Sequence, residues 1–271
     1  MKRWMKNAAA VGFLVLFLPY TMTLLINGRQ GIHREQELPQ LEYRVLSCLL
    51  QEDYSWMEDG TLDLMAIVYR TECLRAQDGE QEAEESGTLE VYDRNYQRAY
   101  EAVVRTEGKA ITIDGAYREL PYHVVSAGRT REGILLGEAY DYVLAADCPY
   151  DKESEAYLKN YRISGEDLSK VLGVDVTSEN VQAERDSSDY VSRIRISDTE
   201  WKGEEFRSLL HLPSSCFFLE EEGGEIRVTV KGSGHGFGMS LYTANRMILE
   251  GAEPIEIFQK FYRDPACITI P

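Results

Sequence analysis

One histidine stands among four alternating glycines near the C-terminus, in the run GSGHGFGMS that begins at Gly232. Each glycine costs roughly 0.5–1 kcal/mol of backbone order relative to alanine, so the run indicates a loop that side chains would obstruct. Residues 225–231 alternate as a half-buried strand, and residues 240–249 fit a helix that Gly251 ends. This strand–loop–helix order is typical of a phosphate cradle. The run nevertheless lacks both the Gly-Lys-Ser/Thr ending and the G-x-G-x-x-G spacing, so it does not predict a nucleotide site.

A second chemical candidate is Glu52, which follows a predicted helix over residues 41–51. Its neighbours include Leu49, Leu50 and Trp56, and apolar neighbours predict a partly desolvated carboxyl group that can act as a general acid. Beside Asp53, the same glutamate also fits an ordinary surface position.

Arg70 lies eighteen positions after Glu52, in a second predicted helix that starts at Thr61 and continues to Cys73. A guanidinium group suits two roles here. It can hold a carboxylate or acetamido oxygen of a substrate, or it can pair with an acidic side chain of the protein.

The glycine–histidine run, followed by Tyr242 and Ala244-Asn245, resembles the signature of the stage II sporulation protein D (SpoIID/LytB) family. The interval from Glu52 to Arg70-Thr71 is similar to the interval in that family. Further similar blocks are Ala102 to Gly108, Tyr122 to Thr130, and the predicted helices at residues 165–173 and 203–213, with a strand between them. The resemblance covers residues 41–270.

Family resemblance implies an α+β fold, in which a mixed helix and strand domain has a glycan-binding groove between two lobes. It also implies a lytic transglycosylase that cuts peptide-free glycan strands of peptidoglycan during engulfment in sporulation. A single glutamate, here Glu52, would first protonate the leaving oxygen and then deprotonate the muramic 6-hydroxyl, which leaves a 1,6-anhydro end. The alternative is a non-catalytic glycan-binding protein that stimulates a cell-wall amidase. Expected partners are therefore glycan strands, an amidase and a membrane scaffold protein.

The resemblance also implies a set of substrate-binding residues: Arg70, His123, Ser126, Gly128, Thr130, Gly234, His235, Gly236, Ser240 and Tyr242. Leu241 departs from the family pattern, which has glutamine there, and this removes an amide from the expected groove. Residues 76–91 contain no cysteine or histidine of the kind that binds zinc in some members, so no metal and no cofactor are expected.

The composition of the chain limits both the size of its core and the classes of partner that it can bind. The chain has 271 residues, of which 44% are hydrophobic, which is enough for one substantial core or two small lobes. A net charge of −17 argues against nucleic acid as a partner, because phosphate binding needs a basic face. The five cysteines show no C-x-x-C spacing; Cys48 and Cys73 lie in helical patterns and fit buried apolar positions.

The N-terminus predicts a membrane segment. Lys2, Arg3 and Lys6 precede an apolar run over residues 8–26, which is long enough to cross a bilayer as a helix. An uncleaved anchor is favoured over a signal peptide, with the rest of the chain outside the cytoplasm. The expected domains are thus residues 1–27 as the cytoplasmic end and anchor, 28–40 as a linker, and 41–271 as the SpoIID-like domain.

Overall fold

A computed structural model describes residues 38–78, 94–177 and 180–270. The chain divides into two compact units, Met1–Pro39 and Gln40–Pro271. Every helix and strand discussed below belongs to the second unit.

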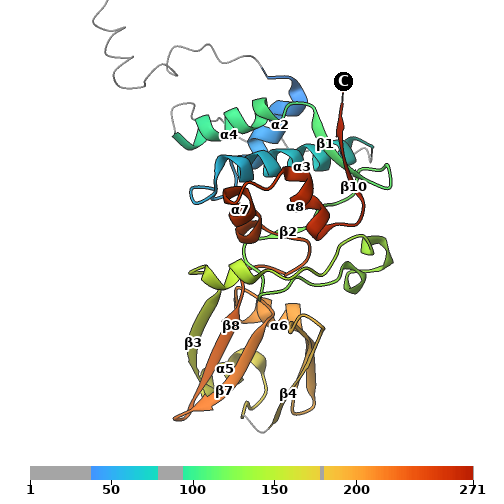
Figure 1. The fold of residues 1–271 in the computed structure, drawn as a ribbon. Helices are drawn as coiled ribbons and strands as arrows, with labels where there is room; N and C mark the ends of the chain where they lie inside the picture. Colours follow the sequence, from blue (N-terminus) through green and yellow to red (C-terminus); the bar gives the residue numbers. More distant parts are fainter. Residues whose placement is uncertain (1–37, 79–93, 178–179, 271) are drawn as a thin grey trace, which may run out of the picture. The chain divides into compact units, whose positions relative to one another are not determined.

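Three helices open this unit and pack against one another: α2 (Gln40–Leu49), α3 (Asp59–Asp78) and α4 (Arg94–Arg105). Strand β1 (Lys109–Ile113) lies against α3 and pairs antiparallel with β10 (Pro265–Thr269). Helices α7 (Leu241–Leu249) and α8 (Pro254–Phe261) lie next to this group in Figure 1, and α7 contacts α3. The first and last parts of the unit therefore share one helical region.

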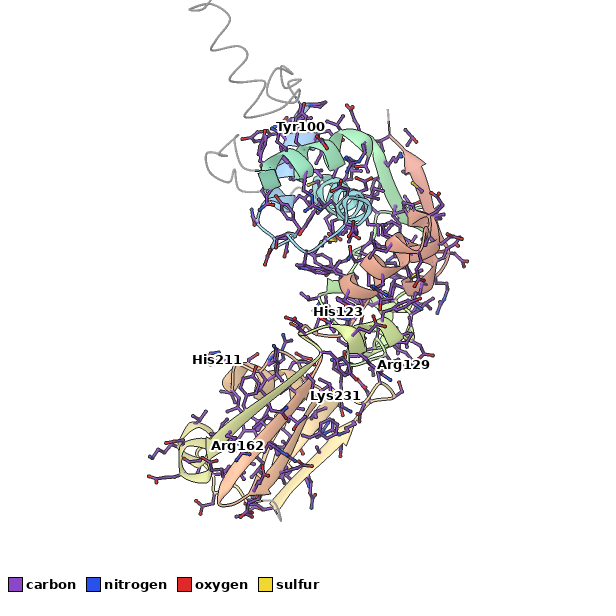
Figure 2. All side chains as sticks on the ribbon, turned by 60° about the vertical axis from the view of Figure 1, so that its left-hand side comes forward. Tyr100, His123, Arg129, Arg162, His211 and Lys231 are labelled. Atoms are coloured by element: carbon purple, nitrogen blue, oxygen red, sulfur yellow. The ribbon has the colours of Figure 1, made fainter. Side chains whose placement is uncertain are left out.

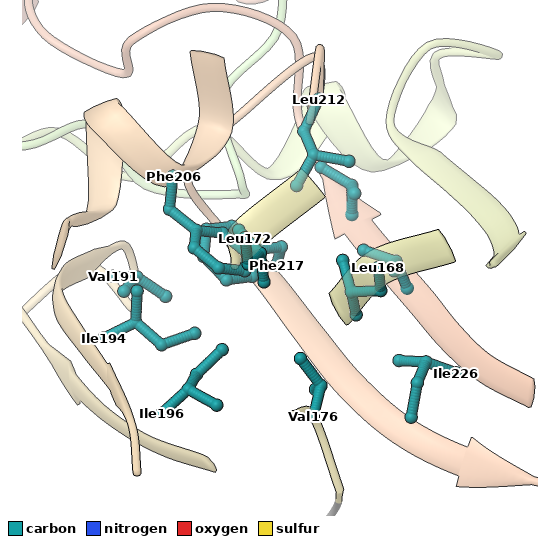
Figure 3. Packing of buried hydrophobic residues seen from close by; sticks show 12 residues of the cluster. Leu168, Leu172, Val176, Val191, Ile194, Ile196, Phe206, Leu212, Phe217 and Ile226 are labelled. Atoms are coloured by element: carbon teal, nitrogen blue, oxygen red, sulfur yellow. The ribbon is translucent and has the colours of Figure 1, made fainter. Parts of the chain in front are cut away.

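Two three-stranded antiparallel sheets form from the middle of the chain. One has the order β3 (Leu158–Ser164), β8 (Glu225–Lys231), β7 (Phe217–Glu222). The other has the order β4 (Val181–Arg185), β5 (Val191–Ile196), β6 (Thr199–Lys202). Helices α5 (Gly165–Leu172) and α6 (Gly203–Leu209) accompany them, and the apolar side chains of both sheets and both helices make one core (Figure 3).

A short parallel pair joins the helical region to the sheets. Strand β2 (Tyr122–His123) lies beside β9 (Met239–Ser240), with Tyr122 opposite Met239 and His123 opposite Ser240. The 3₁₀ helices η2 (Gly133–Leu135), η3 (Glu138–Tyr140) and η4 (Pro149–Glu153) lie between β2 and β3. Because the glycine–histidine run connects β8 to β9, it brings the chain back from the sheets to the helices.

The fold prediction is wrong as stated. It combined an α+β domain, a groove between two lobes and an N-terminal transmembrane helix, whereas the structure is a mixed α/β unit. Across the described ranges, no helix has both the length and the apolar character needed to cross a bilayer. Residues 8–26, where that helix was predicted, lie outside the described residues. The predicted division of the chain into an anchor (1–27), a linker (28–40) and a SpoIID-like domain (41–271) stays a prediction.

Several single elements are confirmed. Strand β8 and helix α7 flank the glycine run as predicted, and Gly251 follows α7 with a φ of 90°. Helices α2 and α3 correspond to the two predicted helices around Glu52 and Arg70, and α3 extends beyond Cys73 to Asp78. The periodicity of apolar residues was therefore a reliable guide in these segments.

Candidate active site

An exposed carboxylate is held by two tyrosines. Glu52 lies three residues beyond the end of α2, and its Oε1 accepts hydrogen bonds from the hydroxyls of Tyr69 and Tyr122, each at 3.1 Å. The two hydroxyl oxygens lie 2.8 Å apart. Tyr69 comes from α3 and Tyr122 from β2, so two separate elements fix one carboxylate oxygen.

Both tyrosines stay protonated at neutral pH. Burial raises the pKa of Tyr122 to about 12, and the nearby Glu52 charge adds to this effect. Burial is also the main cause that raises the pKa of Tyr69, reinforced by Tyr122 and Glu52. The hydroxyls therefore serve as donors to Glu52. The sequence predicted apolar surroundings for this carboxyl group, whereas in the structure Glu52 is exposed and binds two tyrosine hydroxyls.

Aromatic rings flank the Glu52 loop. Trp56, from the turn after Glu52, stacks on Tyr242 of α7 with ring centroids 6.3 Å apart and planes 26° apart. Trp56 is 36% exposed and Tyr242 is half-buried. Amphipathic rings of this kind suit a ligand that has both apolar faces and hydroxyl groups.

Asn245 of α7 clamps the same loop. Its Oδ1 accepts hydrogen bonds from the Glu58 backbone N–H at 2.7 Å and from the Thr61 hydroxyl at 2.8 Å. The side chain is 7% exposed. Helix α7, which begins directly after the glycine–histidine run, therefore fixes the connection between Glu52 and α3.

The four alternating glycines all have φ values in the left-handed region, between 68° and 118°. A Cβ at Gly234 would lie 2.5 Å from the Cβ of His123, and one at Gly236 would lie 2.4 Å from the ring of Tyr190. A Cβ at Gly238 would lie 1.9 Å from the Pro121 carbonyl oxygen. Only glycine therefore lets this loop lie against the segment 121–127 and the Tyr190 ring.

Substitution of one of these glycines tests that geometry. Gly238→Ala is expected to lower the free energy of unfolding by at least about 2 kcal/mol, from left-handed strain and the backbone clash together. Gly251→Ala is the matched control, because Gly251 has a φ of 90° and open space around it; it should cost about 1 kcal/mol. Urea unfolding measures both. Equal losses in the two variants would contradict the close packing of the loop.

Arg131 supports the loop from below. Its guanidinium donates to Asp186 at 2.7 Å, to Glu204 at 3.0 Å and to the His235 carbonyl at 3.2 Å. It also lies 4.3 Å from the centre of the Phe237 ring. Being 6% exposed, Arg131 acts as a structural support of the histidine loop.

His235 is half-buried and neutral. Burial is the main cause that lowers its pKa. The Phe237 N–H donates to its Nδ1 at 3.1 Å, so Nε2 carries the proton of the neutral ring. The Tyr122 backbone lies within hydrogen-bonding reach of the ring. His235 also lies against His123, the neighbour of Tyr122 in β2, and the Tyr122 hydroxyl binds Glu52.

His123 lies beneath His235, with ring centroids 5.8 Å apart. It is 4% exposed; its Nδ1 donates to the Phe237 carbonyl at 3.0 Å, and its Nε2 has no hydrogen-bond partner among the described residues. Burial, together with the nearby His235, lowers its pKa to about 3. Figure 2 places His123 where the helical region meets the sheets, away from His211.

Acid should unfold the protein partly through His123. Its pKa falls from 6.5 to about 3 on folding, so the unfolded chain takes up a proton that the folded chain does not. The stability linked to the neutral His123 is fully present above pH 6.5, and it is lost as the pH falls toward 3. Going from pH 6.5 to 5 should cost about 2 kcal/mol. Urea unfolding at both pH values should show a smaller loss in His123→Gln than in the parent or in the exposed control His211→Gln. An unchanged pH slope in His123→Gln would refute this role.

Four of the predicted substrate-binding residues are buried and bonded within the protein. Ser126 and Ser240 both bind the buried carboxylate of Asp151: the Ser126 N–H donates at 2.7 Å and the Ser240 hydroxyl at 2.8 Å. The Thr130 hydroxyl donates to the Leu144 carbonyl at 3.1 Å. Arg70 is 0% exposed and pairs with Glu42 at 2.6 Å. For these four, the structure indicates a structural role in place of substrate contact, because no side-chain atom is open to a ligand.

Among the remaining predicted residues, His123 is buried and bonded to the Phe237 carbonyl, and the others divide in two. Glu52 binds the Tyr122 hydroxyl, Tyr242 stacks on Trp56 of the Glu52 loop, and Gly234 and Gly236 shape the loop that carries His235. Gly128 is half-buried beside Lys152 and does not contact them. Tyr69 and Asp151 were not predicted, because each acts across more than fifteen residues of sequence; Asn245 belongs to the family signature but was not named as a site residue. Within the ranges 38–78, 94–177 and 180–270, no cluster of three or more histidine, cysteine or acidic side chains is arranged to hold a metal ion.

Comparison with known proteins supports the sequence resemblance. Over 176 residues the chain is 31% identical to stage II sporulation protein D of Bacillus amyloliquefaciens and 28% identical to that of Bacillus subtilis (strain 168). Each match covers 64% of this chain and 51% of the relative, so the chain spans about half the length of the curated relatives it matches. No protein-family model matches the chain. The predicted resemblance is confirmed by the two relatives.

Proposed function

Because the chain belongs to the family of stage II sporulation protein D, we propose that it acts on the cell envelope in sporulation and cleaves glycan strands of peptidoglycan. The observation that carries the proposal is the exposed Glu52 carboxylate, which accepts hydrogen bonds from two tyrosines and belongs to the same loop as Trp56, whose ring stacks on Tyr242. A single positioned carboxyl group can act first as the acid and then as the base when the substrate supplies its own nucleophile.

In the proposed reaction Glu52 works as acid and then as base. The protonated carboxyl group gives its proton to the oxygen of the leaving sugar while the glycosidic bond breaks. The resulting carboxylate takes the proton of the muramic 6-hydroxyl, whose oxygen bonds to the anomeric carbon and forms a 1,6-anhydro ring. No second carboxylate is needed, in contrast to enzymes that activate water or attack the sugar themselves.

Other residues of the site would hold the sugar. The exposed face of Trp56 is available for a pyranose ring. The buried Leu241, where the family has glutamine, is 2% exposed and belongs to the packing of α7. At this position the chain lacks an amide for a substrate, which is the observation that favours the alternative function.

That alternative is a glycan-binding protein that stimulates a cell-wall amidase without cutting glycan. Incubation of the purified chain with peptide-free glycan strands, followed by mass spectrometry of the products, separates the two. New 1,6-anhydro-muramic ends support the cleavage proposal. Glycan binding without such ends, together with faster peptide release by an added amidase, would support the alternative, and no binding would exclude both.

The tyrosine pair should matter for rate rather than for binding. In a Tyr69→Phe/Tyr122→Phe variant, Glu52 loses both donors, so the rate of formation of 1,6-anhydro ends should fall about tenfold or more. Tyr140→Phe is the matched control, since the Tyr140 hydroxyl donates to Glu119 at 2.6 Å, outside this site. A double variant that forms 1,6-anhydro ends at the parent rate would show that the tyrosines do not position Glu52.

A further inference from the structure

One side of α7 follows the connection between α2 and α3. Tyr242, Asn245 and Ile248 are three positions apart, which places them along the same side of the helix. Tyr242 stacks on Trp56, before α3 begins. Ile248 lies against the first turn of α3, where a Cβ on Gly60 would come within 2.7 Å of the Ile248 side chain. Helix α7 therefore contacts this connection along most of its length.

Asn245 makes the polar contact in the middle of this side. Its Oδ1 accepts hydrogen bonds from the Glu58 N–H at 2.7 Å and from the Thr61 hydroxyl at 2.8 Å. Asn245 is 7% exposed and Thr61 is 0% exposed, so the hydroxyl contact is shielded from water. The Glu58 carbonyl in turn accepts from the N–H groups of Thr61 and Leu62, at 2.9 and 3.2 Å. One oxygen of Asn245 thus fixes both the start of α3 and the end of the loop before it.

That loop, residues 50–58, is held by partners outside it. Within the loop, the Met57 N–H donates to the Tyr54 carbonyl at 3.0 Å, and the Asp53 carboxylate accepts from Ser55. Neither of these contacts reaches another element. Arg98 of α4 donates to the Met57 carbonyl from a second helix. The loop that carries the candidate acid is therefore tied to α4 and to α7.

We propose that Asn245 is a positioning residue for Glu52, which sets the place of the acid relative to the glycosidic bond without touching the substrate. Hydroxyl groups from α3 and β2 hold the Glu52 carboxylate, whereas its backbone belongs to the loop that Asn245 ties to α7. Helix α7 also begins directly after the glycine–histidine run, so one helix sets the positions of the run and of the loop. This role rests on the proposed glycan cleavage. A reacting group displaced by about 1 Å can lose about 10²-fold in rate.

Asn245→Leu tests this role on the purified chain. Leucine has a similar size but accepts no hydrogen bond, so the Glu58 N–H and the Thr61 hydroxyl lose their acceptor. At saturating peptide-free glycan, the rate of formation of 1,6-anhydro ends should fall about 10–100-fold. The glycan concentration that gives half the maximal rate should stay close to the parent value. In hydrogen exchange followed by mass spectrometry, peptides that cover residues 50–58 should exchange faster than in the parent.

Two variants separate positioning from a general loss of stability. Asn245→Asp keeps an oxygen that can accept both hydrogen bonds, so it should restore the rate and the slow exchange of the loop. Thr243→Val removes a buried hydroxyl of the same helix, which donates to Asp151 at 2.7 Å, outside the loop. This variant should unfold at a lower urea concentration. Its rate while folded, and the exchange of residues 50–58, should both stay at the parent values.

Failure of this role and failure of the proposed function give different results. A parent chain that forms no 1,6-anhydro ends would remove the proposed function, together with any positioning role in it. If the parent cuts glycan, an Asn245→Leu chain with the parent rate would overturn the positioning role alone. Equal rate losses in Asn245→Leu and Thr243→Val would also overturn it.

Thr61→Val gives the same test if Asn245→Leu does not fold. It removes only the hydroxyl contact and leaves the Glu58 N–H with its acceptor. The rate should therefore fall by a smaller factor than in Asn245→Leu, with the half-saturating glycan concentration again unchanged. A folded Thr61→Val chain that cuts at the parent rate would overturn the positioning role.

Discussion

Glu52→Gln is expected to abolish most of the proposed cleavage while leaving the fold and glycan binding intact. Glutamine keeps the size of the side chain, and its carbonyl oxygen can still accept the hydrogen bonds of Tyr69 and Tyr122. It can neither donate an acidic proton nor take one from the 6-hydroxyl. Loss of a positioned acid and base typically costs about 10²–10⁴-fold in rate, so the yield of 1,6-anhydro ends should fall by that factor.

Asp53→Asn is the matched control for this substitution. Asp53 is the next residue and is also exposed, but its carboxylate accepts only from the backbone N–H and hydroxyl of Ser55, at 3.3 and 2.8 Å. The neutralised Asp53 should leave the rate close to that of the parent. Binding to glycan strands and urea unfolding should be unchanged in both variants. A Glu52→Gln protein that cuts at the parent rate would remove the acid from the proposed mechanism.

The sequence predicted the glycine loop well because the backbone conformation of the loop depends on the residue types within it. Alternating glycines indicate a backbone that excludes side chains, and all four indeed have left-handed φ values against nearby backbone or rings. It could not show what the loop packs against, since the segment 121–127 lies more than a hundred residues earlier. Nor could it show that His235 would share its surroundings with a second, buried histidine.

The interval between Glu52 and Arg70 correctly indicated the helix on which Arg70 lies. It did not indicate which face of that helix Arg70 occupies. It placed Arg70 in α3 correctly, yet successive residues of a helix point about 100° apart. Tyr69 therefore faces Glu52, whereas Arg70 faces Glu42 in the interior. A spacing in sequence gives the turn of a helix on which a residue lies, and the packing of the neighbouring helix decides which residue of that turn reaches the site.

The hydroxyl-bearing residues show a different limit. Ser126 and Ser240 were predicted to face a sugar because hydroxyl groups suit sugars, but the structure gives them Asp151 as a partner. Burial raises the pKa of Asp151 even against the hydrogen bonds of Ser126, Thr243 and Ser240. A buried carboxylate needs such donors wherever the chain can supply them, and Asp151 comes from a 3₁₀ helix with no recognisable signal for this role.

The buried ion pair of Arg70 predicts a large effect on stability. Arg70 donates to both carboxylate oxygens of Glu42, at 2.8 and 2.6 Å, and to the Lys109 carbonyl at 2.9 Å. Arg70→Met would leave Glu42 buried with only the Gly108 N–H, at 3.3 Å, as a donor. Breaking a buried pair from one side typically costs about 3–5 kcal/mol, because one charge remains without its partner. Urea unfolding should show a loss of that size.

Two further variants decide whether that loss is structural. Arg105 lies on α4, is exposed and pairs with Asp63 of α3. Arg105→Met should lower the free energy of unfolding by less than about 1 kcal/mol. Glu42→Leu/Arg70→Met removes both buried charges and should recover most of the stability, since apolar replacements of a buried pair are often neutral. If Arg70 only holds the helices together, the recovered double variant should also form 1,6-anhydro ends at the parent rate. A stable double variant without cleavage would instead indicate that Arg70 has a role in substrate binding, as the resemblance to the family implies.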